Sequence, residues 1–426
     1  MRWLALLLPL LTLADGSKYS VSYPASDKPN ELIFPTTYNL WIPEGVKRIR
    51  TIIVHQHGCG AGSNQGAVTA ADDLHWQALA RKWDGALLGP VIQQPDKTDC
   101  QKWCDPRHGS EARFLQALQD LATSAHHPEI AEAPWCLWGH SGGGFWASIM
   151  HARHPDKIVA IWFRSGTSYL YWHANSDGKA PTNPIEPIEL SVAAMGVPMM
   201  CNPGTKENGD ARFNGAWVGN LEMFKAYRAQ GAPIGFAPDP KTSHQCGDQR
   251  YAAIAFFDSC LELHLPTTGN QLIAIDQSQG RLAPLLGQQT QAVSAQPNLT
   301  MSWMPAKFAS AWEQYVTKGI IEDTTPPLAP FNVKTQATTK GVEITWDAHA
   351  DLESGLQEFI IQKNGQPLAH LPSKANNPFG KPVFQGMSYG DTPAPKAPEM
   401  RFVDPTGKAS DTYKIISVNT AGLSSL

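Results

Sequence analysis

The chain of 426 residues has no long apolar run after its N-terminal segment, no basic cluster, and no cysteine beyond Cys260. A helix that crosses a bilayer needs about twenty apolar residues, and none follows the N-terminal segment. The net charge is only −4, and Lys and Arg are not gathered into a patch that would bind nucleic acid or an anionic membrane surface. We therefore expect a protein without nucleic-acid or membrane partners that acts on small or neutral molecules. Nothing in the sequence indicates its oligomeric state.

The apolar run at the N-terminus is short. Met1 and Arg2 give a cationic start, Trp3 to Ala14 are mostly apolar, and small residues lie near Ala14 and Gly16. This is the pattern of a cleaved secretory signal, and the run is shorter than a membrane anchor requires. We assign residues 1–16 to a signal peptide and expect a secreted or periplasmic protein.

Seven cysteines lie in the first 260 residues: Cys59, Cys100, Cys104, Cys136, Cys201, Cys246 and Cys260. In an exported chain this odd number permits up to three disulfides and leaves at least one thiol. Cys100 and Cys104 have no matching Cys or His pair at zinc-finger spacing, which argues against a metal site. Cys59 could pair with either Cys100 or Cys104.

Apolar runs and helical patterns alternate between residues 17 and 265. Strand-like runs are at 51–54, 85–91, 157–163, 197–201 and 234–237, and helical patterns are at 74–83, 110–125, 145–153, 211–229 and 249–263. This rhythm predicts an α/β domain with a mostly parallel sheet and helices on both faces. Residues 266–325 follow as an extension with a helix at 305–319 and a proline-rich linker.

The last hundred residues, 326–426, have the alternation of an all-β domain. Asn364-Gly365 is a hairpin signal, Trp346 lies on an early strand, and Tyr413 occupies a tyrosine-corner position. This part resembles a fibronectin type III domain, and such a domain does not itself imply catalysis.

The segment Gly139-His140-Ser141-Gly142-Gly143 lies between a strand-like run and a helical pattern. Gly-x-Ser-x-Gly in this context is the nucleophile elbow of α/β-hydrolases, where glycines allow a sharp turn. The bare pattern also arises by chance, because glycine is common. The strand before it and the helix after it support Ser141 as a nucleophile.

A serine nucleophile needs a base, and fourteen histidines compete for this role. His140 is adjacent to Ser141 and points away from it, whereas His151 and His154 lie along the following helix. His264 lies at a helix end. His244 follows the last strand of the α/β domain, on the side where the Ser141 turn also lies, and we predict that it is the base.

The histidine in turn needs an acid. Glu207, in the loop after the penultimate strand, is the first candidate, and Asp210 is the alternative. Either gives the order Ser, acid, His that the fold requires. Because Cys201 precedes the acid loop and Cys246 follows the base, we also predict a disulfide between these two cysteines.

Two backbone amides could stabilise the negative charge that develops on a carbonyl oxygen. Gly142 follows Ser141, and Cys59 lies in the run His57-Gly58-Cys59-Gly60 after an earlier strand. His55 and His57 form a His-x-His pattern, but no further ligands follow at metal-site spacing. We predict an oxyanion hole rather than a metal centre.

The chain resembles secreted esterases of the polyhydroxybutyrate depolymerase and feruloyl esterase type. Four features carry the resemblance, in this order: the His57 to Cys59 run, the segment 100–104, the helix from Ser110 and the elbow. The resemblance covers roughly residues 30–265. It implies an α/β-hydrolase with Ser141 as nucleophile, His244 as base and Cys59 as an oxyanion donor. The acid in that family is usually Asp, where this chain has Glu207, and no polymer-binding module is recognisable.

Aromatic residues near the expected cleft could contact the substrate: Trp103, Tyr169, Tyr171 and Trp172. Together these features predict a secreted serine esterase that cleaves small or polymeric esters through an acyl-enzyme, without metal or cofactor. A serine peptidase on the same scaffold is an alternative. So is a binding or adhesion protein with an inactive hydrolase domain.

Overall fold

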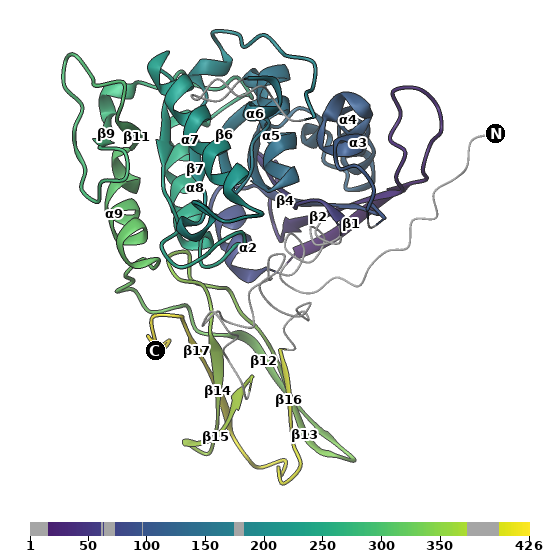
Figure 1. Cartoon of the computed structure of the whole chain (residues 1–426). Helices are drawn as coiled ribbons and strands as arrows, with labels where there is room; N and C mark the ends of the chain where they lie inside the picture. Colours follow the sequence, from purple (N-terminus) through teal and green to yellow (C-terminus); the bar gives the residue numbers. More distant parts are fainter. Residues whose placement is uncertain (1–15, 61–62, 64–72, 96, 174–182, 373–399) are drawn as a thin grey trace.

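The computed structural model describes residues 16–60, 63, 73–95, 97–173, 183–372 and 400–426, so the predicted signal peptide lies almost entirely outside it. An eight-stranded sheet forms the centre of its larger part (Figure 1). In spatial order its strands are β1 (Gly16–Tyr23), β2 (Thr36–Pro43), β4 (Ala86–Ile92), β3 (Ile52–Gln56), β5 (Trp135–His140), β6 (Ile158–Arg164), β7 (Met199–Asn202) and β8 (Ile234–Phe236).

The strand directions give the sheet its class. β2 pairs antiparallel with both β1 and β4, whereas each pairing from β4 through β3, β5, β6 and β7 to β8 is parallel. The parallel strands require crossover helices, which cover both faces. This strand order, with one reversed strand and a sharp turn between β5 and the next helix, is the α/β-hydrolase fold.

The two faces of the sheet bury separate apolar cores. Side chains alternate along each strand, so in β3 Ile52 and Val54 belong to one core and Ile53 to the other. The first core is covered by α4 (Ser110–Ser124), α5 (Gly142–Arg153) and α7 (Asn214–Ala229). The second is covered by α2 (Leu74–Lys82), α8 (Arg250–His264) and α9 (Ala309–Lys318). Parallel strands buried on both sides are expected to be as apolar as these are.

The extension packs on the α/β domain through α9, at the position where the sequence predicts a helix. Trp312 Nε1 donates to the carbonyl oxygen of Phe236 at 3.1 Å, and the Tyr315 hydroxyl donates to Asp239 at 3.0 Å. Gly319 ends the helix in the left-handed conformation, with φ 67°. Three short strands accompany α9: β9 (Gly280–Ala283), β10 (Gln291–Ala292) and β11 (Ser302–Pro305).

The C-terminal residues form two three-stranded antiparallel sheets, which confirms the all-β prediction. One contains β12 (Phe331–Thr338), β13 (Gly341–Asp347) and β16 (Arg401–Asp404), and the other β15 (Gln366–Leu371), β14 (Glu358–Lys363) and β17 (Tyr413–Val418). Asn364 and Gly365 make the hairpin turn with φ of 51° and 78°. The Tyr413 hydroxyl donates to Asp404 at 2.8 Å. The fibronectin type III assignment stays a prediction.

This all-β part projects from the end of the molecule that carries α2 (Figure 1). His75 of α2 donates through Nε2 to the carbonyl oxygen of Leu352 at 2.8 Å, so the two parts are in direct contact. In the regions that the structure describes, none of the helices has the length and apolar character required to cross a membrane.

Candidate active site

Ser141 occupies the sharp turn between β5 and α5. Its backbone has φ 54° and ψ −117°, a conformation that costs free energy in a residue with a side chain and is often kept at functional sites. The glycines near Ser141 allow neighbouring backbone segments to pack closely against the turn. A Cβ on Gly143 would collide with the carbonyl oxygen of Gln56, and one on Gly166 would collide with the carbonyl oxygen of Ser141. The turn therefore presents the Ser141 hydroxyl at the carboxyl end of the sheet.

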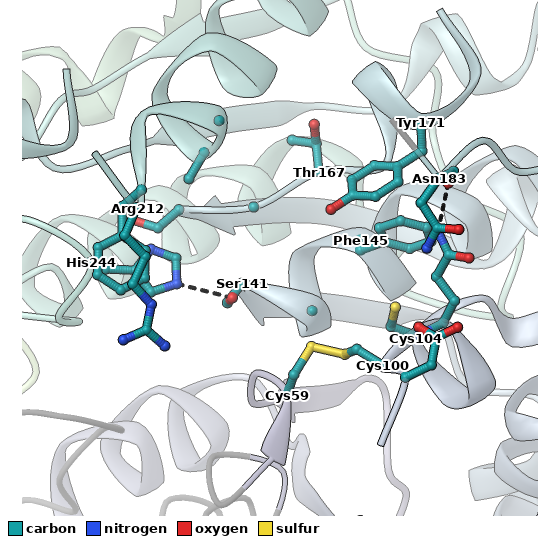
Figure 2. Close-up of a pocket in the computed structure, with 18 residues that line it drawn as sticks. Cys59, Cys100, Cys104, Ser141, Phe145, Thr167, Tyr171, Asn183, Arg212 and His244 are labelled. Atoms are coloured by element: carbon teal, nitrogen blue, oxygen red, sulfur yellow. Dashed lines mark hydrogen bonds between the residues drawn. A yellow bond between two sulfur atoms is a disulfide. The ribbon is translucent and has the colours of Figure 1, made fainter. Parts of the chain in front are cut away.

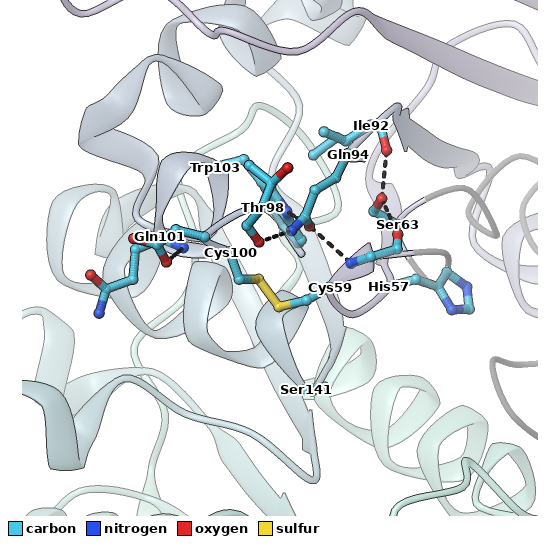
Figure 3. The surroundings of a disulfide bond; sticks show 12 residues. His57, Cys59, Ser63, Ile92, Gln94, Thr98, Cys100, Gln101, Trp103 and Ser141 are labelled. Atoms are coloured by element: carbon cyan, nitrogen blue, oxygen red, sulfur yellow. Dashed lines mark hydrogen bonds between the residues drawn. A yellow bond between two sulfur atoms is a disulfide. The ribbon is translucent and has the colours of Figure 1, made fainter. Parts of the chain in front are cut away.

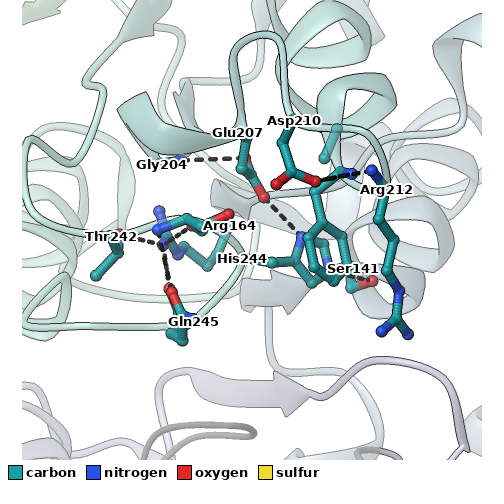
Figure 4. Close-up of polar contacts among 12 residues, drawn as sticks. Ser141, Arg164, Gly204, Glu207, Asp210, Arg212, Thr242, His244 and Gln245 are labelled. Atoms are coloured by element: carbon teal, nitrogen blue, oxygen red, sulfur yellow. Dashed lines mark hydrogen bonds and ion pairs between the residues drawn. The ribbon is translucent and has the colours of Figure 1, made fainter.

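The structure brings the predicted serine, histidine and acid into one hydrogen-bonded chain (Figure 4). His244 Nδ1 lies 2.6 Å from Glu207 Oε1, and His244 Nε2 lies 2.9 Å from Ser141 Oγ. Because the carboxylate accepts from Nδ1, Nε2 accepts from the serine hydroxyl. The Glu207 side chain is 0% exposed and that of His244 only 12% exposed, so the bond between the acid and the histidine is largely shielded from water.

Glu207 and His244 meet because the loops after β7 and β8 run side by side. Lys206 N donates to the carbonyl oxygen of Thr242 at 3.1 Å. Gly204 N donates to the second oxygen of Glu207, also at 3.1 Å, which fixes the carboxylate. This is the first candidate acid of the sequence prediction.

Asp210 is not bonded to the histidine. Its Oδ1 accepts the backbone amides of Arg212 and Phe213 at 2.8 and 2.7 Å, just before α7. These two amides lower the pKa of the Asp210 carboxyl from its ordinary value. The residue ties down the start of a helix, and the structure places it outside the Ser141 hydrogen-bond chain.

Arg164, at the end of β6, holds the loop of His244 in place and was not singled out from the sequence. Its buried guanidinium donates to Asn202 of β7 at 2.9 Å and to three groups of the histidine loop: the Thr242 hydroxyl at 2.7 Å, the Ser243 carbonyl at 3.0 Å, and the Gln245 carbonyl. Burial would lower its pKa, and negative charge at Asp239 and other neighbours raises it overall. The signal in the sequence was an arginine at the end of an otherwise apolar strand.

His140 supports the same loop from beneath. Its Nε2 lies 2.8 Å from the carbonyl oxygen of His244, and a carbonyl oxygen can only accept, so His140 is the donor. Burial, and then the proximity of His244, hold the pKa of His140 well below its ordinary value. The Nε2–H of His140 is thus committed to the loop that carries His244.

Phe213 covers the outer face of the histidine. The two rings are parallel to within 7°, with centroids 4.1 Å apart. This contact shields one face of the imidazole from solvent and limits tilting of the ring. No periodicity or motif in the sequence singles out Phe213.

The disulfide Cys59–Cys100 lies directly beside the nucleophile (Figure 3). Of the two partners considered for Cys59, the structure has Cys100. A Cβ on Gly142 would collide with the Cys59 sulfur and would lie 3.4 Å from the Cys59 amide nitrogen. Gly142 also begins α5, where backbone amides have no partner within the helix. The two predicted oxyanion donors are therefore neighbours beside Ser141.

A buried glutamine holds the loop of Cys59 against the segment of Cys100. Gln94 Oε1 accepts the Gly60 amide at 2.9 Å and the Trp103 indole at 2.6 Å, and its Nε2 donates to the carbonyl oxygen of Thr98 at 2.8 Å (Figure 3). Trp103 is 0% exposed. Its predicted contact with substrate is wrong, because the ring is part of this support.

The predicted disulfide between Cys201 and Cys246 is also wrong, since both residues are buried thiols. Cys201 packs in the core on one face of the sheet, and Cys246 packs in the core on the other. Burial raises the pKa of the Cys201 thiol well above its ordinary value. Proximity to the acid and the base along the chain therefore does not bring the two sulfurs to the same side of the sheet.

A cavity of about 350 Å³ opens at Ser141 (Figure 2). It is lined by Cys59, Asp99, Cys100, Gln101, Cys104, Ser141, Gly142, Phe145, Ser165, Gly166, Thr167, Tyr171, Asn183, Arg212, Phe213, Gly215, Ala216 and His244. Of the aromatic residues predicted to contact substrate, Tyr171 is among them. Tyr169 instead stacks on His173 with centroids 4.4 Å apart, and Trp172 is only 8% exposed. The predicted substrate contacts of Tyr169 and Trp172 are therefore wrong. Of the aromatic residues in α6 (Tyr169–Trp172), Tyr171 is the one that lines the cavity.

The sequence matches no protein-family model and no curated protein. Solved structures resemble it at low identity. A dienelactone hydrolase from Anabaena variabilis is 17% identical over 54% of this chain and 88% of its own, with a TM-score of 0.33. An S-formylglutathione hydrolase from Agrobacterium tumefaciens is 12% identical over 59% of this chain and 95% of its own, with a TM-score of 0.35. A ferulic acid esterase is 14% identical over 54% of this chain and 91% of its own, with a TM-score of 0.37.

Among the described residues, one group of carboxylates is close enough to share a metal ion: Asp323, Asp351 and Glu353. It belongs to the linker and the all-β part, whereas the cavity at Ser141 is lined by none of the three. Burial raises the pKa of the Asp351 carboxyl to about 7. An acidic group of this kind does not define a metal site by itself.

Proposed function

We propose that the protein is a secreted serine esterase that hydrolyses carboxylic esters through an acyl-enzyme on Ser141. The observation that carries the proposal is the bonded chain from the Ser141 hydroxyl through His244 to the buried Glu207. The disulfide Cys59–Cys100 supports export, because disulfides persist in oxidising compartments. A cavity of about 350 Å³ lies within the size range of small-molecule sites and supports a small ester as substrate.

In the proposed mechanism Ser141 Oγ attacks the ester carbonyl carbon while His244 Nε2 takes the hydroxyl proton. Glu207 holds the other ring nitrogen and stabilises the imidazolium that forms. The amides of Cys59 and Gly142 donate to the carbonyl oxygen as it becomes negative, and each such donor is worth about 3 kcal/mol in the transition state. His244 then gives its proton to the leaving alcohol, and water cleaves the acyl-enzyme by the same steps in reverse.

Covalent labelling tests this proposal directly. We expect a fluorophosphonate probe to modify Ser141, because its hydroxyl is activated by His244, and we expect p-nitrophenyl acetate to be hydrolysed. Mass spectrometry of the labelled peptide identifies the modified residue. A paired assay on an ester and the matching amide separates an esterase from a peptidase. Absence of both labelling and ester turnover would instead support a non-catalytic protein.

The disulfide offers a second test, because it holds the segment whose Cys59 amide we assign to the oxyanion hole. Cys100→Ser removes the bridge and leaves Cys59 in the chain. We expect kcat for a short ester to fall about tenfold with a smaller change in KM, since the lost interaction is made mainly in the transition state. Reduction of the wild-type protein with dithiothreitol is expected to give the same fall and to leave the variant unaffected. Full kcat after verified reduction would contradict the assignment.

A further inference from the structure

Arg212 is an exposed cation at the rim of the cavity that contains Ser141 (Figure 2). Its guanidinium carbon lies 4.8 Å from the centroid of the Phe213 ring, which in turn stacks on His244. Among the described residues, no carboxylate lies within 4.0 Å of the guanidinium nitrogens. The nearby Asp210 directs Oδ1 to backbone amides instead. Arg212 is thus held beside the histidine without an ion pair among the described residues, although its charge is close enough to help lower the pKa of the Asp210 carboxyl.

The two halves of an ester occupy different sides of Ser141. His244 delivers a proton to the leaving oxygen, so the alcohol half lies next to His244 and Phe213, on the side of Arg212. The acyl half extends the opposite way, toward Phe145 and Tyr171, which Figure 2 shows across the cavity from Arg212. A group attached to the alcohol half therefore comes within reach of the guanidinium.

The charge at the other end of the cavity is negative. Asp99 lines the cavity there. It directly precedes Cys100, and Figure 2 shows Cys100 on the far side of the cavity from Arg212. An anionic group on the alcohol half meets the guanidinium, whereas the same group on the acyl half meets Asp99. A guanidinium also matches the planar shape of a carboxylate, which it can bind with two parallel hydrogen bonds.

We infer that Arg212 binds a carboxylate on the alcohol half of the ester, so that the preferred substrates are esters of hydroxy acids. This inference rests on the proposed esterase function and specifies its substrate class. Arg212 is a substrate-binding residue here and takes no part in proton transfer.

The test compares two butanoyl esters with similar leaving groups, 3-butanoyloxybenzoate and the neutral 3-butanoyloxybenzamide. We expect the wild-type protein to prefer the carboxylate by about tenfold in kcat/KM, with the preference weakening as salt is added. Arg212→Gln is expected to abolish the preference, because kcat/KM falls more for the carboxylate ester than for the neutral ester. Arg212→Lys is expected to retain part of it. Arg113→Gln is the matched control, since Arg113 also lies over an aromatic ring, that of Tyr23, away from the cavity.

A second pair places the carboxylate on the acyl half: phenyl hydrogen succinate and phenyl butanoate. Here we expect the wild-type protein to disfavour the charged ester. Equal kcat/KM on the first pair, or an equal fall on both of its members in Arg212→Gln, would overturn the assignment of Arg212 while leaving the esterase intact. Inactivity of the wild-type protein on all four esters would overturn the esterase, and the Arg212 proposal with it.

Discussion

Ser141→Ala is expected to lower kcat/KM for p-nitrophenyl acetate by about 10⁴-fold or more, with the fold unchanged. The methyl group keeps the volume at the turn and removes the oxygen that we expect to form the acyl-enzyme. Residual turnover would come from the oxyanion amides and from binding alone. The measurement is steady-state hydrolysis with purified protein, together with circular dichroism and a melting curve to show that the variant is folded.

Ser124→Ala is a suitable control for this substitution. Ser124 also carries a hydroxyl in a bonded position, to the carbonyl oxygen of Leu121 within α4, and it does not line the cavity. We expect its activity to remain within twofold of wild type. Wild-type activity in a folded Ser141→Ala protein would end the proposal of a serine nucleophile.

Glu207→Gln is expected to lower kcat by about 10³-fold to 10⁴-fold, the second largest effect. The carboxamide can donate a hydrogen bond to Nδ1, which favours the wrong tautomer and leaves Nε2 unable to accept the serine proton. It also removes the charge that stabilises the imidazolium. We expect KM to change little, since Glu207 lies behind the histidine and does not line the cavity. Steady-state kinetics on one neutral ester measure both constants.

Asp210→Asn is the matched control, because it makes the same carboxylate-to-amide change three residues further on. An asparagine oxygen can still accept the amides of Arg212 and Phe213. We therefore expect less than a threefold change in kcat. The opposite result, with Asp210→Asn inactive and Glu207→Gln active, would reverse the assignment of the acid.

The elbow and the order of strands and helices could be predicted because they depend on local patterns. The glycines between Gly139 and Gly143 predict a sharp turn. The β-branched run Ile52 to Val54 predicts a strand that is buried on both faces, as the structure shows. The histidine followed from position alone, since loops after parallel strands meet at one edge of the sheet. The sequence left Glu207 and Asp210 both open, because a few residues within a loop decide which carboxylate faces the base.

The incorrect predictions concern side-chain direction. Cys201 and Cys246 are close to the acid and the base along the chain, but the alternation of β7 sends Cys201 into one core while Cys246 packs in the other. Aromatic residues suit binding, so the sequence predicts Trp103 in the cleft. In the structure the Trp103 indole instead donates to the buried Gln94 and helps to fix a loop. Neither direction follows from composition or spacing, since both depend on contacts between distant segments.

The buried guanidinium of Arg164 also affects how the base can move. It bonds at once to the end of β7 and to the segment between Thr242 and Gln245, so this segment cannot open alone without leaving a buried charge short of acceptors. Opening of the base segment is thereby coupled to opening of the central strands, which are among the slowest parts of a protein to fluctuate. The alignment of Ser141 and His244 is thus a property of the resting protein and does not wait for a ligand to arrive.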